Sequence, residues 1–201
     1  MDLTLVTGPM FAGKTSYLIN AIKNTECKST IIATHHTDIR FSKGDELINH
    51  DGECLKHSVL RIDSLSKMPD IDKDASILIA IDEAQFFEDI VGYVRDKWEN
   101  GYKNLKIILC GLNGDFRQTP FGKEPNWISK LISIASNVHY LKARCWKCGE
   151  PACFSIRKPN TDSKSTFLVG GADIYTAACF KHCKGCDDDD DVSIAATGGG
   201  D

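Results

Sequence analysis

Residues 8–15 read Gly8-Pro9-Met10-Phe11-Ala12-Gly13-Lys14-Thr15 in this chain of 201 residues. They fit the pattern G-x-x-x-x-G-K-[ST] without a mismatch. The glycines let the backbone curl so that its N–H groups face phosphate oxygens. Lys14 is placed to reach the β- and γ-phosphates of a nucleotide, and the Thr15 hydroxyl is placed to bind Mg²⁺.

The flanking residues give this loop the context that phosphate binding requires. The short apolar run Leu3–Thr7 precedes it and predicts a buried strand. Thr15–Glu26 follows with apolar residues at helical spacing, so a helix would present its positive N-terminal end to the same anion. The alternative is that the glycine-rich loop matches the pattern by chance. A chance match would have no reason to lie between a strand and a helix, as this one does. We therefore predict that residues 8–15 bind the phosphates of ATP.

Aliphatic runs farther along the chain predict the rest of a sheet. The expected strands are Ser29–Thr34, Ile77–Ile81, Leu105–Cys110 and Val138–Leu141, and the last of these is expected to be a core strand. Strands that alternate with helices favour parallel pairing through crossovers. The pattern predicts an α/β fold, with a P-loop NTPase-like parallel sheet flanked by helices.

Two further helices are expected between these strands. Ile90, Val94 and Trp98 recur every four residues, and Gly101 is expected to end that helix. Trp127–Ala135 is the second, with Pro125 near its start. Residues 38–57 are polar and predict a loop or mobile segment.

Two carboxylates, Asp82 and Glu83, directly follow the expected strand at 77–81. Asp82 is expected to hold Mg²⁺. Glu83 would activate water in an ATPase, or accept the proton of an acceptor hydroxyl in a kinase. Alternatively, both acids simply favour the first turn of the next helix. The pair alone does not separate a kinase from an ATPase, although the chain leaves no room for a second motor domain.

The chain has nine cysteines, and several form metal-type pairs after residue 143. Cys145 with Cys148, and Cys179 with His182, can each supply two ligands to a tetrahedral zinc ion. Cys183 is an alternative fourth ligand, since it begins a further C-x-x-C pair. A redox C-x-x-C is the other interpretation, but neither pair lies in a thioredoxin-like βαβ unit. We predict a small zinc-stapled β lobe.

The net charge of -4 arises from the end of the chain. Residues 187–201 hold six Asp and no Lys or Arg, so they predict a disordered acidic tail, and the rest is close to neutral. This balance argues against a nucleic-acid partner. No stretch reaches the about 18 apolar residues of a membrane helix, and no secretory leader is evident. We therefore expect no membrane partner and a location inside the cell, where both the cytosol and the nucleus fit, and we take cytoplasmic as the expected location.

Five motifs, in this order, resemble those of the zinc-containing, cytosolic-type thymidine kinases of animals, many bacteria and large DNA viruses. They are Gly-Pro-Met-Phe-Ala-Gly-Lys-Thr (8–15), Asp-Glu-Ala-Gln-Phe-Phe (82–87), Gly-Leu-Asn-Gly-Asp-Phe (111–116), the C-x-x-C pair (145–148) and Gly-Gly-Ala-Asp-Ile-Tyr (170–175). The resemblance covers about residues 3–183. It implies a P-loop domain at 1–143, a zinc lobe with a lasso loop as its lid at 144–186, and a tail at 187–201.

The resemblance also implies an activity, in which ATP phosphorylates the 5′-hydroxyl of thymidine or deoxyuridine for nucleotide salvage and DNA synthesis. Glu83 would be the base, Mg²⁺ and a structural zinc the cofactors, and a homotetramer the assembly. Arg40 would lie near the phosphates, although an exposed surface arginine is the commoner situation. The residues implied to bind the nucleoside are Met10, Phe86, Leu112, Phe116, Phe121, Ser155, Arg157, Leu168, Gly170 and Tyr175.

Some observations leave other interpretations open. Each aromatic residue in that set, taken alone, is more commonly a core residue. Asn113 departs from the family, whose members often have Asp there. A P-loop ATPase or switch whose zinc lobe binds a protein or nucleic acid would share the phosphate loop and the metal ligands. A zinc-binding module with a decayed nucleotide site is disfavoured by the intact Lys14 and Glu83.

Overall fold

The computed structural model describes residues 1–37, 47–48, 52, 54–55, 57–124, 126–158 and 170–183. Arg40, Pro125, Leu168 and the tail at 187–201 lie outside the described residues. The expectations attached to them, and the division into three segments at residues 143 and 186, stay predictions.

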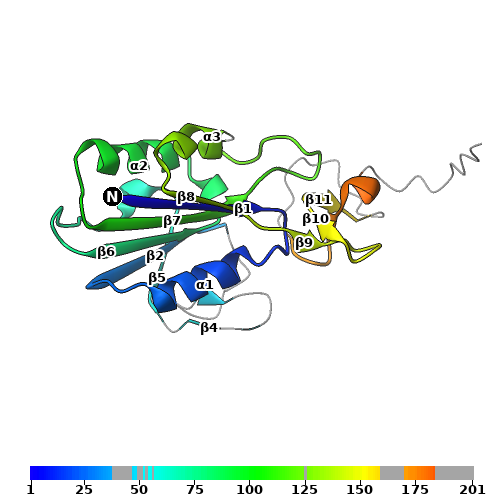
Figure 1. Cartoon of the computed structure of the whole chain (residues 1–201), viewed down its shortest axis with the longest axis horizontal. Coiled ribbons are helices and arrows are strands. Elements are labelled where there is room, and N and C mark those ends of the chain that lie inside the picture. The colour runs from blue at the N-terminus through cyan, green and yellow to red at the C-terminus, as the bar shows by residue number, and fades with distance from the viewer. Residues whose placement is uncertain are drawn as a thin grey trace, which may run out of the picture.

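Six parallel strands form the central sheet in the order β5-β2-β6-β7-β1-β8 (Figure 1). Every residue of β6 is buried, as expected for an aliphatic strand with a neighbour on each side. The parallel α/β fold predicted from the sequence is confirmed. The strands are β1 (Asp2–Gly8), β2 (Ser29–His35), β5 (Val59–Ile62), β6 (Ile77–Asp82), β7 (Leu105–Leu112) and β8 (Asn137–Tyr140).

Helices cover both faces of this sheet (Figure 1). On one face α1 (Lys14–Asn24) packs Leu18 and Ile19 into a core with Val6. On the other face α2 (Ile90–Glu99) and α3 (Trp127–Leu131) enclose a second core. Short 3₁₀ turns complete the chain: η2 (Leu65–Lys67), η3 (Ala84–Phe86), η4 (Ile132–Ile134) and η5 (Phe180–His182).

The expected helix ends agree closely with the structure. The second expected helix, Trp127–Ala135, is α3 followed directly by η4. Gly101 follows α2 with a φ of 73°, and its N–H donates to the Trp98 carbonyl at 3.2 Å. A left-handed glycine after the last turn is a common helix ending, so the predicted stop at Gly101 is confirmed.

The structure differs from the sequence-based expectations at β8, at β5 and within residues 38–57. The last strand, expected in the core, is the edge strand β8, where Val138 is exposed. Strand β5 was not expected, because Arg61 interrupts its apolar run and only β2 pairs with it. Within 38–57, expected as a loop, β3 (Leu47–Ile48) and β4 (Cys54–Leu55) pair antiparallel.

A small β lobe lies beyond the carboxyl ends of the sheet strands (Figure 1). Two antiparallel pairs build it, and its small core of Ala143, Cys145, Ala152 and Ala177 contacts Phe11 and Ala12 of the phosphate loop. In the parts of the chain that the structure describes, no helix is long and apolar enough to cross a membrane. The lobe strands are β9 (Ala143–Arg144), β10 (Pro151–Ala152), β11 (Phe154–Arg157) and β12 (Tyr175–Ala178).

Candidate active site

The phosphate loop joins β1 to α1, as the motif requires. Its two glycines adopt positive φ angles, 152° at Gly8 and 80° at Gly13. A Cβ atom on Gly8 would lie 2.3 Å from the carbonyl oxygen of Leu141, so only glycine fits there. Gly13 is the N-cap of α1, and this residue directs the helix N-terminus toward the loop.

Lys14 begins α1 and is buried, with its side chain folded back along the loop. Its ammonium donates to the carbonyl oxygens of Gly8 at 3.2 Å and Pro9 at 2.7 Å. A buried cation needs partners of this kind. These contacts hold the positive charge at the loop, where the phosphates of a nucleotide would need it.

Thr15 and Asp82 meet although they lie 67 residues apart in the chain. The Thr15 hydroxyl donates to Oδ2 of Asp82 at 2.8 Å, and Oδ1 of Asp82 accepts the Glu83 N–H at 3.0 Å. Asp82 is only 1% exposed. A hydroxyl and a carboxylate side by side are oxygen ligands of the type that Mg²⁺ takes, so the two residues fit this ion.

Glu83 leaves β6 in the left-handed region, with φ 54° and ψ 41°. This backbone conformation is uncommon for a residue other than glycine, and such residues concentrate at functional sites. The turn lifts the chain out of the sheet at its carboxyl edge. The carboxylate Oε2 accepts a hydrogen bond from Nε2 of Gln85 at 2.5 Å.

Asp115 organises the turn that follows β7. Its carboxylate accepts the backbone N–H groups of Arg117 at 2.8 Å and Thr119 at 3.0 Å, and it pairs with the Arg117 guanidinium. Burial would raise the pKa of Asp115, but the hydrogen bonds from Thr119 and Arg117 outweigh it and lower the pKa below its usual value. The turn is therefore held by a charged carboxylate.

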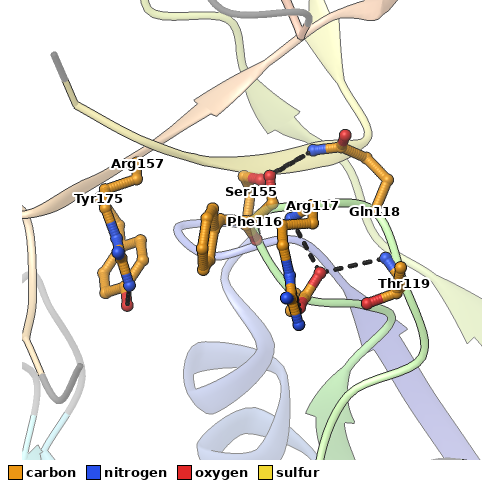
Figure 2. A network of polar contacts seen from close by, with 8 residues as sticks. Phe116, Arg117, Gln118, Thr119, Ser155, Arg157 and Tyr175 are labelled. Atoms are coloured by element: carbon orange, nitrogen blue, oxygen red, sulfur yellow. Dashed lines mark hydrogen bonds and ion pairs between the residues drawn. The ribbon is translucent and has the colours of Figure 1, made fainter. Parts of the chain in front are cut away.

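Several residues implied to bind the nucleoside lie close to this turn. The Arg157 guanidinium lies 4.0 Å from the centre of the Phe116 ring and 5.7 Å from that of Tyr175 (Figure 2). Its Nη2 also donates to the Tyr175 hydroxyl at 3.3 Å. On the η3 side, the rings of Phe86 and Phe121 meet edge to face at 5.8 Å. The structure therefore gathers these aromatic residues in two groups.

Ser155 makes a contact that sequence reasoning missed. Its hydroxyl oxygen accepts the backbone N–H of Met10 at 2.9 Å, across 145 residues of chain. Ser155 is buried in β11, so this hydrogen bond ties the small lobe to the phosphate loop.

Among the other residues implied to bind the nucleoside, Leu112 donates its N–H to Oε1 of Gln85, Gly170 precedes β12, and Leu168 lies outside the described residues.

Asn113 forms a second link between the sheet and the lobe. Its side-chain amide donates to the Tyr140 hydroxyl at 3.0 Å and to the Cys153 carbonyl at 3.2 Å. The Tyr140 hydroxyl also reaches the Cys153 carbonyl, at 3.2 Å. Asn113, which stands where family members often have Asp, therefore makes two hydrogen bonds through its side chain. Nothing in the local sequence signals these long-range partners.

The cluster of Cys145, Cys148, Cys179 and His182 brings together the four metal ligands predicted from their spacing. Their ligand atoms all lie within 4.8 Å of one another, and the sulfurs of Cys148 and Cys179 are 3.8 Å apart. Zinc–sulfur bonds of about 2.3 Å in a tetrahedron place two sulfurs at about this separation. The cluster could hold a zinc ion.

The surroundings of Cys145 favour its thiolate over its thiol. Burial would raise the pKa of Cys145, but hydrogen bonds from the backbone of Cys179, Cys148 and Lys147 and from His182 outweigh it and lower the pKa to about 5. Nδ1 of His182 lies 3.4 Å from the Cys145 sulfur. Cys183, the alternative ligand, stays outside the cluster and donates to the Phe180 carbonyl at 3.2 Å.

Comparison with known proteins gives this arrangement a family. A family profile described as thymidine kinase matches residues 1–183. The chain belongs to the thymidine kinase family. The expectation of an ATP-dependent nucleoside kinase, made from five motifs, is thereby confirmed at the level of the family.

Individual relatives of this thymidine kinase family member come from viruses and plants. The thymidine kinase of Amsacta moorei entomopoxvirus is 37% identical over 187 residues, covering 89% of this chain and 96% of the relative. That of fowlpox virus is 38% identical over 188 residues, covering 90% and 95%. Thymidine kinase a of Arabidopsis thaliana is 34% identical over 184 residues, covering 89% and 73%.

Proposed function

We propose that this chain transfers the γ-phosphoryl group of ATP to the 5′-hydroxyl of thymidine, with deoxyuridine as the alternative acceptor. The observation that carries the proposal is the meeting of Thr15 and Asp82 at 2.8 Å, with Glu83 next in the chain. Phosphate-binding and acidic groups thus share one edge of the sheet, beside the aromatic residues after β7. Five family motifs and the thymidine kinase relatives support the choice of acceptor.

On the nucleotide side, the backbone N–H groups of the phosphate loop bind the phosphates and Lys14 neutralises the β- and γ-phosphates. Thr15 and Asp82 would hold Mg²⁺, which, when bound, spreads the charge that develops on the transferred group. The buried positions of Lys14 and Asp82 support these roles, because charged groups act more strongly away from water.

On the acceptor side, Glu83 takes the proton of the 5′-hydroxyl as the reaction proceeds. The 5′-oxygen forms a bond to the γ-phosphorus, and the bond from that phosphorus to the bridging oxygen of ADP breaks. The proton ends on the Glu83 carboxylate, and ADP leaves with the bridging oxygen. The fixed left-handed backbone of Glu83 supports this role, since it limits where the carboxylate can point.

The thymine base would lie among Met10, Leu112, Phe116 and Tyr175, where a flat ring finds apolar and aromatic contacts. The segment around residues 153–175, of which residues 159–169 lie outside the described residues, would cover it as a lid that excludes water. We further propose that zinc at the Cys145 cluster anchors both ends of that segment, because the cluster joins β9 to η5. Zinc would then be structural, not catalytic.

Phosphate transfer from labelled ATP tests the proposal. Purified protein with Mg²⁺ is supplied with each of the four deoxynucleosides or with none. Label on thymidine but not on deoxyadenosine or deoxyguanosine is the expected result. Equal consumption of ATP with and without a nucleoside would contradict the proposal and indicate an ATPase.

Assembly and location form a separate part of the proposal. A homotetramer is expected from the family resemblance, and a cytoplasmic location likewise. The exposed apolar side chains of Ile132, Val138 and Tyr140 around the edge strand β8 offer a surface that association could cover. Light scattering tests the assembly, with a mass of four chains of 22.2 kDa expected. A monomeric mass would contradict it.

A further inference from the structure

Arg157 is the last residue of β11 and lies directly opposite Tyr175, the first residue of β12. Directly opposite residues of an antiparallel pair place their side chains on the same face of the sheet, close enough to interact. Nη2 of Arg157 donates to the Tyr175 hydroxyl at 3.3 Å, and the guanidinium carbon lies 5.7 Å from the centre of the Tyr175 ring. The two side chains therefore form one unit at the end of the small lobe.

The same guanidinium also contacts Phe116, which belongs to the turn after β7 and not to the lobe. The guanidinium carbon of Arg157 lies 4.0 Å from the centre of the Phe116 ring (Figure 2). A cation at this distance over a ring face is attracted by the electrons of the ring, and the attraction grows as water is excluded. Both side chains are half-buried. Arg157 therefore connects Tyr175 on the lobe with Phe116 beside the sheet.

Phe116 is itself fixed by its own turn. The Phe116 carbonyl accepts Nε2 of Gln118 at 2.7 Å, and the Asp115 carboxylate pairs with the Arg117 guanidinium at 3.0 Å. Arg117 lies over the Phe116 ring at 5.6 Å, on the side opposite to Arg157 (Figure 2). Guanidinium groups thus lie over both faces of the ring, so a flat base would meet Phe116 at the ring edge.

From this arrangement we propose that Arg157 is a positioning residue, which acts on the nucleoside through Tyr175 and does not contact the nucleoside itself. Because Arg157 is held against Phe116 on a fixed turn, it keeps the Tyr175 side chain in one place beside the sheet edge where the thymine base would lie. The inference rests on the proposed function. It changes the role that the family resemblance implies for Arg157, from a nucleoside contact to the support of one.

Two other roles would use the same contacts, and kinetics separate all three. Positioning of Tyr175 affects the KM for thymidine alone, because ATP would bind at the phosphate loop. A purely structural link would loosen the whole lobe when broken and would raise both KM values, since Ser155 ties the lobe to that loop. Direct binding of the nucleoside by Arg157 would make the effects of Arg157 and Tyr175 on the KM for thymidine independent of each other.

The main variant is Arg157→Met, which keeps the length of the side chain but removes the guanidinium. We expect the KM for thymidine to rise about 5- to 10-fold, the KM for ATP to stay within about twofold, and kcat to stay within about threefold. Arg95→Met is the matched control. Arg95 is a half-buried arginine of α2 that donates to the Lys130 carbonyl at 3.2 Å, and its replacement should leave both KM values unchanged.

A double-mutant cycle with Tyr175→Phe tests whether Arg157 acts through Tyr175. Tyr175→Phe removes only the hydroxyl that Arg157 bonds, so we expect a rise of about twofold in the KM for thymidine. The double variant should have the same KM as Arg157→Met alone, because the hydroxyl then has no guanidinium to hold it. Effects that multiply would show that the two residues act independently and would overturn the proposal.

Arg157→Lys keeps the test valid if Arg157→Met does not fold. Lysine retains the positive charge but not the flat guanidinium, so the KM for thymidine should rise about threefold while the KM for ATP stays unchanged. In the folded variants, an unchanged KM for thymidine, or an equal rise in both KM values, would overturn the proposal.

Wild-type protein distinguishes this outcome from failure of the proposed function. If wild type does not transfer phosphate to thymidine, the proposed acceptor is wrong, and the role of Arg157 is overturned with it. If wild type transfers phosphate and the folded Arg157 variants keep its KM for thymidine, the role of Arg157 alone is overturned.

Discussion

Ser155 shows how a single hydroxyl can connect two parts of the molecule. It lies in β11 of the small lobe, yet its oxygen accepts the Met10 N–H of the phosphate loop at 2.9 Å. Phe11, the next loop residue, contacts the core of the same lobe. Movement of the lobe would therefore displace the phosphate loop.

Replacing Ser155 with Ala should weaken this connection. The half-buried Met10 N–H would lose its acceptor, so we expect the free energy of unfolding to fall by about 1 kcal/mol and KM for ATP to rise about threefold. Chemical denaturation and steady-state kinetics measure the two effects. Ser129→Ala, which removes an exposed hydroxyl bonded to the Asn126 carbonyl, should change neither.

The kinetics also decide between two roles for Ser155. The family resemblance implies that it binds the nucleoside, whereas its hydrogen bond points to the phosphate loop. A rise in KM for thymidine with an unchanged KM for ATP would contradict the connection described here.

The part of the site that could be predicted consists of residues that belong to short motifs with a fixed spacing. Lys14 and Thr15 follow from the loop motif, and the four metal ligands follow from two short pairs. Contacts such as Ser155 with Met10 and Asn113 with Tyr140 were not predictable, because their partners are far apart in the chain and have ordinary residue types. The roles assigned to Glu83 and to the nucleoside residues stay predictions.

At the scale of elements, the turn from β1 into the phosphate loop depends on one close approach. Gly8 passes so near Leu141, just after β8, that a Cβ atom would collide with its carbonyl oxygen. The same turn gives Gly8 its positive φ of 152°. The path of the loop therefore depends on glycine at this position.

The substitution Gly8→Ala should destabilise the protein by about 2–3 kcal/mol, because the backbone of β1 or of Leu141 must shift. Gly92→Ala is the matched control. Gly92 lies in α2 with open space around it, so alanine there should stabilise the protein by about 0.5–1 kcal/mol. Chemical denaturation measures both, and a neutral Gly8→Ala would show that the turn can relax.

Strands buried on both faces were the predictable elements. The aliphatic runs of β6 and β7 leave little alternative to a central strand. Edge strands carry a weaker pattern, since one side lacks a neighbour and polar residues are tolerated there. This explains why β5 was missed and why β8, with its exposed Val138, was wrongly expected in the core.

For the whole molecule, the main question is what the metal cluster contributes. The cluster joins β9 to η5, so it connects the beginning and the end of the small lobe. The lobe core itself is small, built mainly from alanines and Cys145. A core of this size stabilises little by burial alone, so the metal is expected to supply much of the stability of the lobe.

Cys148→Ser should therefore lose bound zinc and loosen the lobe. We expect less than one zinc per chain by elemental analysis and faster hydrogen exchange in β11 and β12, with β6 and β7 unchanged. Cys183→Ser is the matched control and should retain zinc, because its sulfur bonds the Phe180 carbonyl outside the cluster. Zinc loss in the Cys183 variant, with zinc retained in the Cys148 variant, would reverse the ligand assignment.

A small β lobe with a cysteine and histidine cluster was predictable from the sequence, since cysteine pairs and short β runs replace the alternation of strands and helices toward the end of the chain. The order of the strands was not, because nothing local in β1 specifies β7 and β8 as its neighbours. That order nevertheless brings the ends of β1, β6 and β7 together, which is what assembles the candidate site.

The most direct test of the central claim compares Glu83→Gln with wild type in phosphate transfer to thymidine, alongside binding of ATP. Glutamine keeps the shape of the side chain but cannot accept the proton, so we expect turnover to fall by about 10²–10⁴-fold while ATP binding stays within about threefold. Turnover within a few-fold of wild type would contradict the account and remove Glu83 from the role of base.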